Sequence, residues 1–277
     1  MIYAIIVTYN PEQELMDSQF KSLVEQVDGI IYVDNASSNS PVFPDSEKVV
    51  ILHNLSNEGL AKAQNHGIEY AKSQGADYIL LLDQDSELGS GMVENMLNRL
   101  MSLQADGENV GVICPVKVSA FDGAVSSEIT SLSFKIESRQ IEKTTEVAYS
   151  IASGMLIPMS VLDIIGGMNE NLFIDGLDLE WCCRATHKGF KVYVTPEAKL
   201  YHRLGNGKKD RIESHSTMRE YYITRNDIYI SKQRHIPVGY RLRKKFTPFA
   251  RLLISLVRGN FKYVRSELKG IKDGLSL

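Results

Sequence analysis

The chain has 277 residues, of which 43% are hydrophobic and 23% charged, a balance typical of globular proteins that excludes wholesale disorder, a collagen-like structure and a polytopic membrane protein. Its formal net charge of −3 is unevenly spread, because residues 240–277 hold ten basic and two acidic residues, a charge of +8, and leave −11 for the rest. The length allows one large or two small domains, and the charge pattern predicts an acidic body with a basic C-terminal segment.

The first third of the chain alternates short apolar segments with stretches of helical periodicity. Strands are predicted at residues 2–7, 30–33, 49–52 and 78–82, and helices at residues 12–26 and 59–73. The first apolar run lacks a preceding basic region, so we expect a buried strand there and not a signal peptide. Repeated strand–helix units predict an α/β fold with a mostly parallel, Rossmann-like sheet flanked by helices.

The pattern changes in the second part of the chain. Helices are predicted at residues 92–103, 161–165, 178–188, 216–233 and 248–268, and strands at residues 110–118 and 192–194, the latter ending at Pro196. Residues 121–150 are polar and rich in Ser, Thr and Glu, which suits either antiparallel strands or a mobile loop. Residues 203–216 hold two glycines and several basic residues, and are predicted to form a loop.

The cysteines and apolar stretches indicate a protein of a reducing compartment that does not span a membrane. Cys114, Cys182 and Cys183 are too few for a disulfide framework, and none lies in a CxxC pair. The longest apolar stretch, residues 151–168, is interrupted by Pro158 and Asp163, and so lacks the about 20 apolar residues of a spanning helix. We therefore expect a cytoplasmic protein.

The basic C-terminal segment has three interpretations. Basic residues bracket an apolar stretch, so the segment suits a helix that lies on an anionic membrane surface. A packed helix with a solvated basic face and a homodimer contact fit equally. Nucleic-acid binding is not expected, because the rest of the chain is acidic and no recognition module is present.

Polar residues follow each of the four strands predicted in the first third, at residues 8–11, 34–39, 54–59 and 83–85. The carboxyl ends of parallel strands meet at one edge of a sheet, which is where open α/β sheets bind ligands. Any one of these clusters also fits ordinary turn chemistry, because Asn, Asp, Ser and Gly dominate turns. Four such clusters in succession favour a ligand site at this edge.

The last of these clusters carries two carboxylates, Asp83 and Asp85, on either side of Gln84. Hard oxygen ligands at this spacing suit Mg²⁺ or Mn²⁺, which would bridge to a substrate diphosphate. The chain has neither GxGxxG after its first strand nor a GxxxxGKS/T motif, so the phosphate-binding signatures of dinucleotide-binding Rossmann units and P-loop proteins are missing.

Further candidate groups lie later in the chain. Asp178, near the start of a predicted helix, fits either a general base for an acceptor hydroxyl or a residue that offsets the helix dipole. His202 follows a predicted strand and fits either a further ligand to a cation near Asp85 or a structural histidine. Positive charge for a departing diphosphate would come from Arg203, Lys208, Lys209, Arg211 and Arg225.

Taken in order, these motifs resemble the family 2 inverting glycosyltransferases with the GT-A fold. The resemblance rests on Val7-Thr8-Tyr9-Asn10-Pro11, Val33-Asp34-Asn35-Ala36-Ser37, Asn57-Glu58-Gly59, Leu82-Asp83-Gln84-Asp85, Gly154, Gly166-Gly167-Met168, and Asp178 with Glu180, Trp181 and Arg184. It extends from residue 1 to about residue 230. The Asp-Gln-Asp-Ser run at 83–86, Phe173-Ile174-Asp175 and Trp181-Cys182 resemble the rhamnosyltransferase branch, which uses dTDP-β-L-rhamnose.

The resemblance implies a role for each matched residue. Thr8, Tyr9 and Asn10 would line the nucleotide pocket, Asp34 would accept a hydrogen bond from a pyrimidine N3–H, and Asn57 and Gly59 would pack near the ribose and diphosphate. Asp83 would orient the nucleotide sugar and share the metal, Asp85 would be the principal metal ligand with His202 assisting, and Arg225 would contact phosphate. Asp178 would be the general base, and Glu180, Trp181 and Arg184 would shape or support the acceptor side. Many members carry Glu-Asp where this chain has Leu177-Asp178, so Asp175 is a rival for the base.

The implied reaction is a single displacement that moves L-rhamnose from dTDP-β-L-rhamnose to a hydroxyl of a polyprenyl-linked saccharide in bacterial surface polysaccharide, such as O-antigen or cell wall. A different UDP- or dTDP-sugar donor and a non-catalytic nucleotide-sugar-binding protein are the alternatives. The catalytic domain would cover residues 1–235, with a nucleotide-binding half at 1–85 and an acceptor half at 86–235. Residues 236–277 would form a basic helical extension that places the enzyme at the inner face of the plasma membrane.

Overall fold

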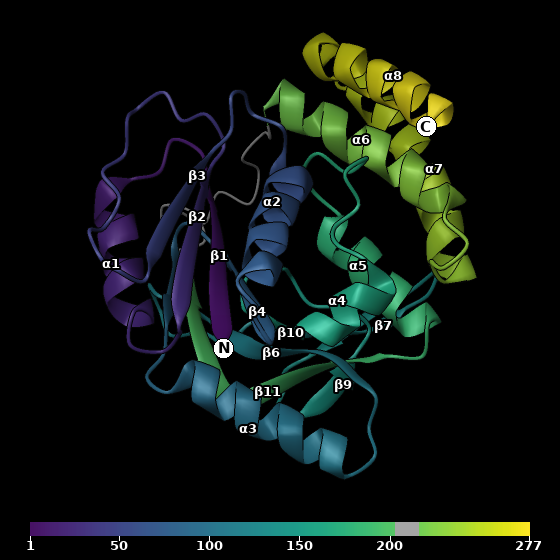
Figure 1. Cartoon of the computed structure of the whole chain (residues 1–277). Helices are drawn as coiled ribbons and strands as arrows, with labels where there is room; N and C mark the ends of the chain where they lie inside the picture. The colour runs from purple at the N-terminus through teal and green to yellow at the C-terminus, as the bar shows by residue number, and fades with distance from the viewer. Residues whose placement is uncertain (203–215) are drawn as a thin grey trace.

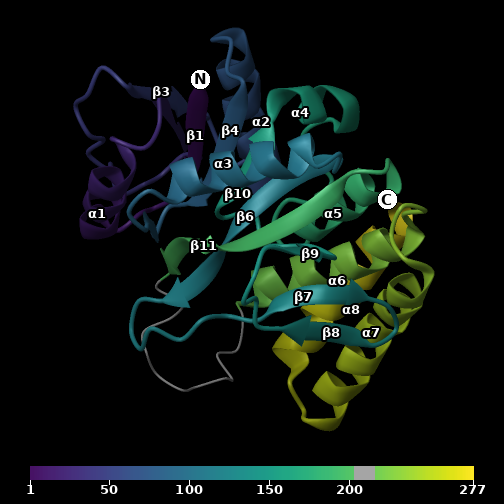
Figure 2. The same cartoon turned by 90° about the horizontal axis from the view of Figure 1, so that it is seen from below.

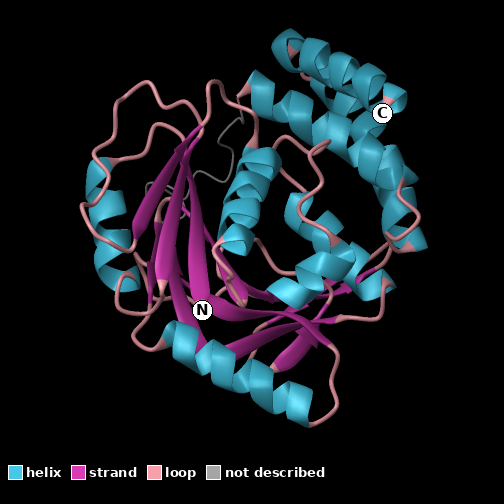
Figure 3. Cartoon of the chain, viewed as in Figure 1, coloured by secondary structure: helices cyan, strands magenta, loops and turns pink. Residues whose placement is uncertain are grey.

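The computed structural model describes residues 1–202 and 216–277, which form an α/β fold with a central sheet between layers of helices (Figure 1, Figure 3). The described sheet has the order β3-β2-β1-β4-β10-β6-β11-β5, and β9 pairs with β11. Its strands are β1 (Ile2–Thr8), β2 (Gly29–Asp34), β3 (Val49–His53), β4 (Tyr78–Asp83), β5 (Ser86–Leu88), β6 (Val110–Ser119), β9 (Thr145–Val147), β10 (Met155–Pro158) and β11 (Lys191–His202). The helices are α1 (Gln13–Leu23), α2 (Leu60–Ser73), α3 (Met92–Ala105), α4 (Met159–Ile165), α5 (Leu177–His187), α6 (Thr217–Lys232), α7 (Val238–Val257) and α8 (Phe261–Ser276).

Strands β1 to β4 form the parallel part of the sheet that the sequence predicts. β1 lies between β2 and β4, with Ile5 in register with Ile31 and Leu81. This row packs in one apolar cluster with α2, α4 and α5, whereas the alternate row with Ile6 and Leu80 packs with α1 and α3. Both faces of these strands are therefore buried, which explains why they are almost continuously apolar.

The second half of the sheet differs from the sequence prediction. Neither β5 nor β10 is predicted, and these short strands pair antiparallel, β5 with β11 and β10 with β4 and β6. The predicted strand end at Pro196 is wrong, because β11 continues to His202. A register shift between Thr195 and Lys199 accommodates the proline, which has no N–H to donate. Since β5 pairs His202 with Ser86, the end of β11 lies beside the turn after β4.

The polar segment at residues 121–150 contains antiparallel strands, the first of the two predicted possibilities. β7 (Glu128–Leu132) and β8 (Ile136–Arg139) form a separate hairpin, and β9 adds to the edge of β11. The turn of this hairpin lies against the start of α7, where a Cβ on Gly239 would approach the Phe134 nitrogen to 2.6 Å (Figure 2). The loop predicted at residues 203–216 lies outside the described residues except for Ser216.

The C-terminal segment forms two helices where the sequence predicts one at residues 248–268. α7 continues through Pro248, and Gly259, with φ of +67°, reverses the chain before α8. α8 packs back on α6, and a Cβ on Gly270 or Gly274 would lie 2.8 or 2.6 Å from an α6 carbonyl oxygen. Among residues 1–202 and 216–277, none of the helices combines the length and apolar character needed to cross a membrane.

Candidate active site

Asp83, Asp85 and His202 converge at the end of β4. The His202 Nε2 lies 3.3 Å from Asp83 Oδ2 and 3.8 Å from Asp85 Oδ1, and one ligand atom from each residue lies within 4.8 Å of the others. The hydrogen bond with Asp83 and the charge of Asp85 raise the pKa of His202 despite its burial. Burial and the negative charge of Asp83 raise the pKa of Asp85, although the charge of His202 opposes this shift. A divalent cation fits this set, since two hard oxygens and an imidazole nitrogen meet there and a cation would offset the repulsion between the carboxylates.

The turn that carries the two aspartates is fixed by side chains from elsewhere in the sequence. Ser153 Oγ accepts a hydrogen bond from the Asp83 backbone N–H at 3.0 Å and lies 2.8 Å from Ser86 Oγ. On the other side, the Gln19 amide donates to the backbone oxygens of Asp83 and Ser86 at 2.6 and 3.0 Å. Sequence reasoning missed Gln19 and Ser153, because a polar residue inside a helix or a loop carries no signal of a partner more than 60 residues away.

A strand-end cavity of about 350 Å³ adjoins the two aspartates. It is lined by Val7, Tyr9, Asn35, Asn57, Gly59, Leu60, Asp83, Gln84, Asp85, Phe173 and Ile174. The structure thus brings together members of all four polar clusters, as the parallel strand order predicts. Gly59 has φ of +88°, and a Cβ there would lie 2.5 Å from the Phe173 ring, so only glycine fits this wall.

Three residues predicted for nucleotide binding lie beside this cavity but are not among those that line it. Thr8 Oγ1 lies 3.3 Å from Asp34 Oδ1, and that carboxylate also accepts from the Ser37 N–H. Asn10 donates its backbone N–H to Ser37 Oγ at 2.9 Å. The Asp34 side chain is only 11% exposed, and its Oδ2 lies 3.6 Å from His53 Nδ1.

An amide network that the sequence did not reveal shapes the floor of the strand-end cavity. Asn35 donates through its side-chain amide to Asn57 Oδ1 at 2.9 Å and accepts from Asn54 at 3.0 Å. Asn57 Oδ1 also accepts from the Gly59 N–H at 3.0 Å. The network joins the loops after β2 and β3, which fixes Asn57 and Gly59 in place.

Asp178 and Asp175 are placed very differently. The Asp175 carboxylate is held by two hydrogen bonds from the Arg219 guanidinium, at 3.0 and 3.2 Å, and its backbone has φ of +64°. Within residues 1–202 and 216–277, the hydrogen bond that the Asp178 carboxylate accepts comes from the Leu179 N–H at 2.8 Å. Burial, with smaller contributions from the charges of Asp83 and Asp175, raises the pKa of Asp178 to about 6. A carboxylate with a raised pKa and few partners is the better proton acceptor.

In the part of the chain that the structure describes, the strand-end cavity is lined without Glu180, Trp181 or Arg184. The Trp181 ring is fully buried, and its N–H donates to the Gly166 oxygen at 3.0 Å. Arg184 bonds the backbone oxygens of Ile165 and Gly167 and pairs with buried Glu180. The sequence predicts that these residues either shape the acceptor side or support it. Their contacts suit support, because they hold the connection between α4 and α5.

Arg225 is linked to Phe173, a residue of the cavity lining, through the ring of Tyr222. Its guanidinium is 4.9 Å from the centre of the Tyr222 ring, which stacks on Phe173 with ring centres 4.6 Å apart. Arg225 also donates to the Asn171 backbone oxygen and to Asn226 Oδ1. The other predicted cations, Arg203, Lys208, Lys209 and Arg211, lie outside the described residues.

Two comparisons of sequence identify relatives of this chain. The model of glycosyl transferase family 2 matches residues 3–165, which is more than half of the chain. The dTDP-rhamnosyl transferase RfbF of Shigella flexneri is 31% identical over 286 residues, with 99% of this chain and 95% of that protein covered.

Solved structures share the fold at low sequence identity. GalNAc-T7, crystallised with UDP, GalNAc and Mn²⁺, is 14% identical with a TM-score of 0.58, and the match covers 73% of this chain but only 43% of that chain. TarS 1–349 of S. aureus, crystallised with UDP-GlcNAc, is 13% identical with a TM-score of 0.58, and the match covers 98% of this chain and 81% of that one. The chain therefore belongs to glycosyl transferase family 2 and is a glycosyltransferase with the GT-A fold.

Proposed function

We propose that this enzyme transfers L-rhamnose from dTDP-β-L-rhamnose to a hydroxyl of a saccharide acceptor in the synthesis of bacterial surface polysaccharide. The observation that carries the donor assignment is the match to RfbF, which is named a dTDP-rhamnosyl transferase and covers 99% of this chain, the whole site included. A pyrimidine suits the site as well, because the Asp34 carboxylate would accept the N3–H that thymine and uracil both carry. We propose residues 1–235 as the catalytic domain and residues 236–277 as its helical extension.

The proposed donor site is the strand-end cavity, with Tyr9, Asn57 and Gly59 against the nucleotide. Thr8 and Asn10 would hold the walls, and Arg225 would contact phosphate. Asp83, Asp85 and His202 would bind Mg²⁺ or Mn²⁺. The crystal structure of GalNAc-T7 with UDP and Mn²⁺ supports a metal in this fold. When bound, such an ion supplies positive charge to the departing diphosphate.

The proposed reaction inverts the anomeric carbon in a single displacement. Asp178 takes the proton of the acceptor hydroxyl, the hydroxyl oxygen bonds to the anomeric carbon, and the bond from that carbon to the diphosphate breaks. The raised pKa of Asp178 supports its role as the base, because a stronger base draws the proton more fully in the transition state. Glu180, Trp181 and Arg184 keep the start of α5 in position.

We expect a screen of nucleotide sugars to give the fastest donor hydrolysis and transfer with dTDP-rhamnose. UDP-galactofuranose, UDP-glucose, UDP-N-acetylglucosamine and their dTDP counterparts are the comparison donors. A faster reaction with any of these would replace the donor assignment while leaving the family intact. Calorimetry with metal and donor that shows binding without turnover of any donor would instead indicate a non-catalytic binding protein.

The outer face of α7 supports a place for this enzyme on a membrane surface. Leu242, Phe246, Phe249, Leu253 and Val257 recur at spacings of three or four residues, and each side chain is at least 47% exposed. Such a row forms one helical stripe.

The basic residues of this segment differ in their partners. Lys244 and Arg251 point inward and pair with Asp227. Lys245, Arg258 and Lys262 are exposed and have no ion pair with any residue in 1–202 or 216–277. Apolar side chains with free cations beside them suit an anionic lipid surface, where a polyprenyl-linked acceptor would be found.

We expect the protein to float with vesicles of phosphatidylcholine and phosphatidylglycerol in a density gradient. Changing Phe246 and Leu253 together to Ser removes two apolar groups worth about 1.5–3 kcal/mol each, so binding should fall at least tenfold. The matched control changes Met101 and Phe121 to Ser, which are 55% and 56% exposed on other elements. Equal flotation of both double variants would contradict membrane binding through α7. Removal of residues 236–277 is a poorer test, because it uncovers the face of α6 that α8 buries.

A further inference from the structure

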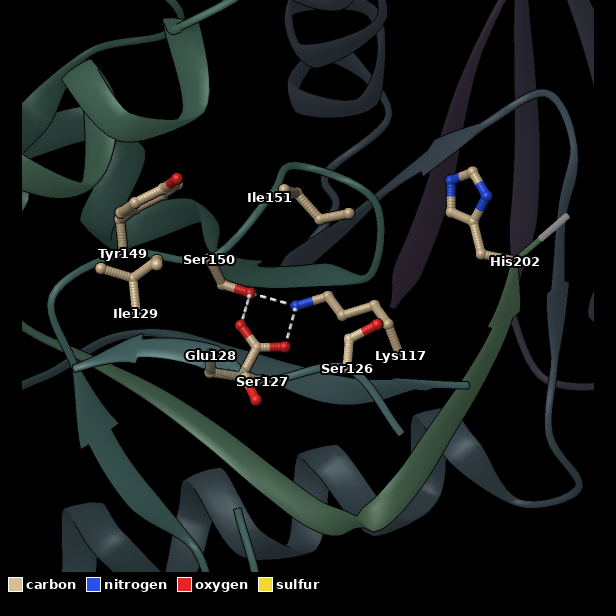
Figure 4. Close-up of a pocket in the computed structure, with 9 residues that line it drawn as sticks. All are labelled: Lys117, Ser126, Ser127, Glu128, Ile129, Tyr149, Ser150, Ile151 and His202. Atoms are coloured by element: carbon tan, nitrogen blue, oxygen red, sulfur yellow. Dashed lines mark hydrogen bonds and ion pairs between the residues drawn. The ribbon is translucent and has the colours of Figure 1, made fainter. Parts of the chain in front are cut away.

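A second cavity, the Lys117 cavity, lies next to the metal-ligating candidates and has His202 in common with the site described above (Figure 4). It measures about 320 Å³ and is lined by Lys117, Ser126, Ser127, Glu128, Ile129, Tyr149, Ser150, Ile151 and His202. His202 belongs to this wall, whereas Asp83 and Asp85 belong to the wall of the strand-end cavity. The three-residue cluster therefore separates the two cavities.

The helix α5, which carries Asp178 in its first turn, passes the Ser150 side of the Lys117 cavity, because the Cys182 sulfur one turn later lies 4.0 Å from the Ser150 backbone oxygen. Burial and then the negative charge of Asp178 raise the pKa of Tyr149, which lines this cavity. A molecule bound here would have the proposed base near one end and the proposed metal ligand His202 at the other. This is the position that an acceptor needs for its hydroxyl to reach both the base and the anomeric carbon.

Three polar side chains in this wall form a closed network (Figure 4). The Lys117 ammonium pairs with Glu128 Oε1 at 3.0 Å and donates to Ser150 Oγ, and the Ser150 hydroxyl donates to Glu128 Oε2 at 3.1 Å. The Lys117 and Glu128 side chains are only 5% and 7% exposed. An ammonium has three donors, so within residues 1–202 and 216–277 Lys117 has one donor left after Glu128 and Ser150.

The remaining lining matches the two faces of a sugar ring. Ile129, Tyr149 and Ile151 offer an apolar surface to C–H groups, and the Ser126 and Ser127 hydroxyls offer hydrogen bonds. A buried ion pair is an expensive way to stabilise a protein core, since apolar residues of equal volume usually serve as well. Charged and hydroxyl groups in one wall instead provide directional recognition of ring hydroxyls.

We propose that the Lys117 cavity receives the terminal sugar ring of the acceptor, and that Lys117, Glu128 and Ser150 determine which sugar is accepted by bonding hydroxyls other than the attacking one. This proposal rests on the proposed function, because it presumes that a nucleotide sugar occupies the strand-end cavity. It assigns the acceptor specificity to the segment from β6 to residue 151, with the β7–β8 hairpin as its outer wall.

The test is Ser127→Trp, which introduces an indole at an exposed position in the lining of the cavity, with Ser138→Trp on β8 as its matched control. Octyl glycosides of glucose, galactose, N-acetylglucosamine and rhamnose serve as acceptor probes. Ser127→Trp is expected to raise the acceptor KM at least about tenfold while the affinity for dTDP stays within about twofold. Ser138→Trp should match the parent enzyme. Ser150→Ala, a smaller change, is expected to alter the ranking of the four glycosides.

Three results would overturn the assignment. One is an unchanged acceptor KM in Ser127→Trp together with an unchanged ranking in Ser150→Ala. Another is an equal rise in the acceptor KM of Ser138→Trp, and the third is a parent enzyme that binds none of the four glycosides. Failure of the proposed function would look different, because the parent enzyme would then neither bind dTDP nor hydrolyse any nucleotide sugar.

Discussion

Asp178→Asn is expected to lower the rate of sugar transfer by about 100- to 10,000-fold, the usual contribution of a general base, with donor affinity nearly unchanged. The amide keeps the shape of the side chain but cannot take a proton. Asp175→Asn is the matched comparison, since Asp175 lies three residues earlier and its carboxylate is held by Arg219. We expect a smaller loss there, caused by release of the loop. An active Asp178→Asn enzyme beside an inactive Asp175→Asn enzyme would transfer the assignment to Asp175.

The same carboxylate should govern the acid side of the pH profile. Asp178 accepts a proton only when ionised, and its pKa in the folded protein is about 6 because of burial and the neighbouring charges of Asp83 and Asp175. The value of kcat/KM should therefore fall about tenfold per pH unit below about 6 and level off above it. A divalent cation at Asp83 would counter one of these negative charges, so added metal should lower the pH at which kcat/KM begins to fall. Any residual activity of Asp178→Asn should not show this fall at acid pH.

The parallel half of the sheet and its ligand edge were predictable because their signals are local. Apolar runs such as residues 78–82 and the polar clusters after them are contiguous in sequence, and parallel topology then determines where they meet. Asp83 and Asp85 were placed correctly for this reason. His202 was harder, since its approach to the turn after β4 involves the unpredicted pairing of β5 with β11. A three-residue strand carries too little periodicity to be recognised.

The C-terminal helices were mispredicted for a related reason. Helical periodicity continues across residues 248–268, and the break at Gly259 follows from the return of α8 to α6. That packing depends on Gly270 and Gly274, whose small size matters only because another helix lies against them. α6 in turn holds the loop before α5, since Asn226 donates to the backbone oxygens of Ile174 and Asp175. The extension is thus mechanically joined to the loop that leads to Asp178.

Chelation by EDTA is expected to abolish transfer, and Mg²⁺ or Mn²⁺ to restore it. A cation on a leaving diphosphate is worth several kcal/mol of transition-state stabilisation, which corresponds to roughly 100-fold or more in rate. Asp85→Asn should produce a comparable loss of transfer activity that added metal does not restore, and it should weaken Mn²⁺ binding in calorimetry.

Glu12→Gln is the matched control, because Glu12 is exposed, its charge reaches Asp85, and it lies outside the three-residue cluster. Full activity in the chelator would refute a metal role and leave the charge of His202 and Arg225 to stabilise the leaving group. A loss in Glu12→Gln equal to that in Asp85→Asn would show that total negative charge matters there, and not coordination by Asp85.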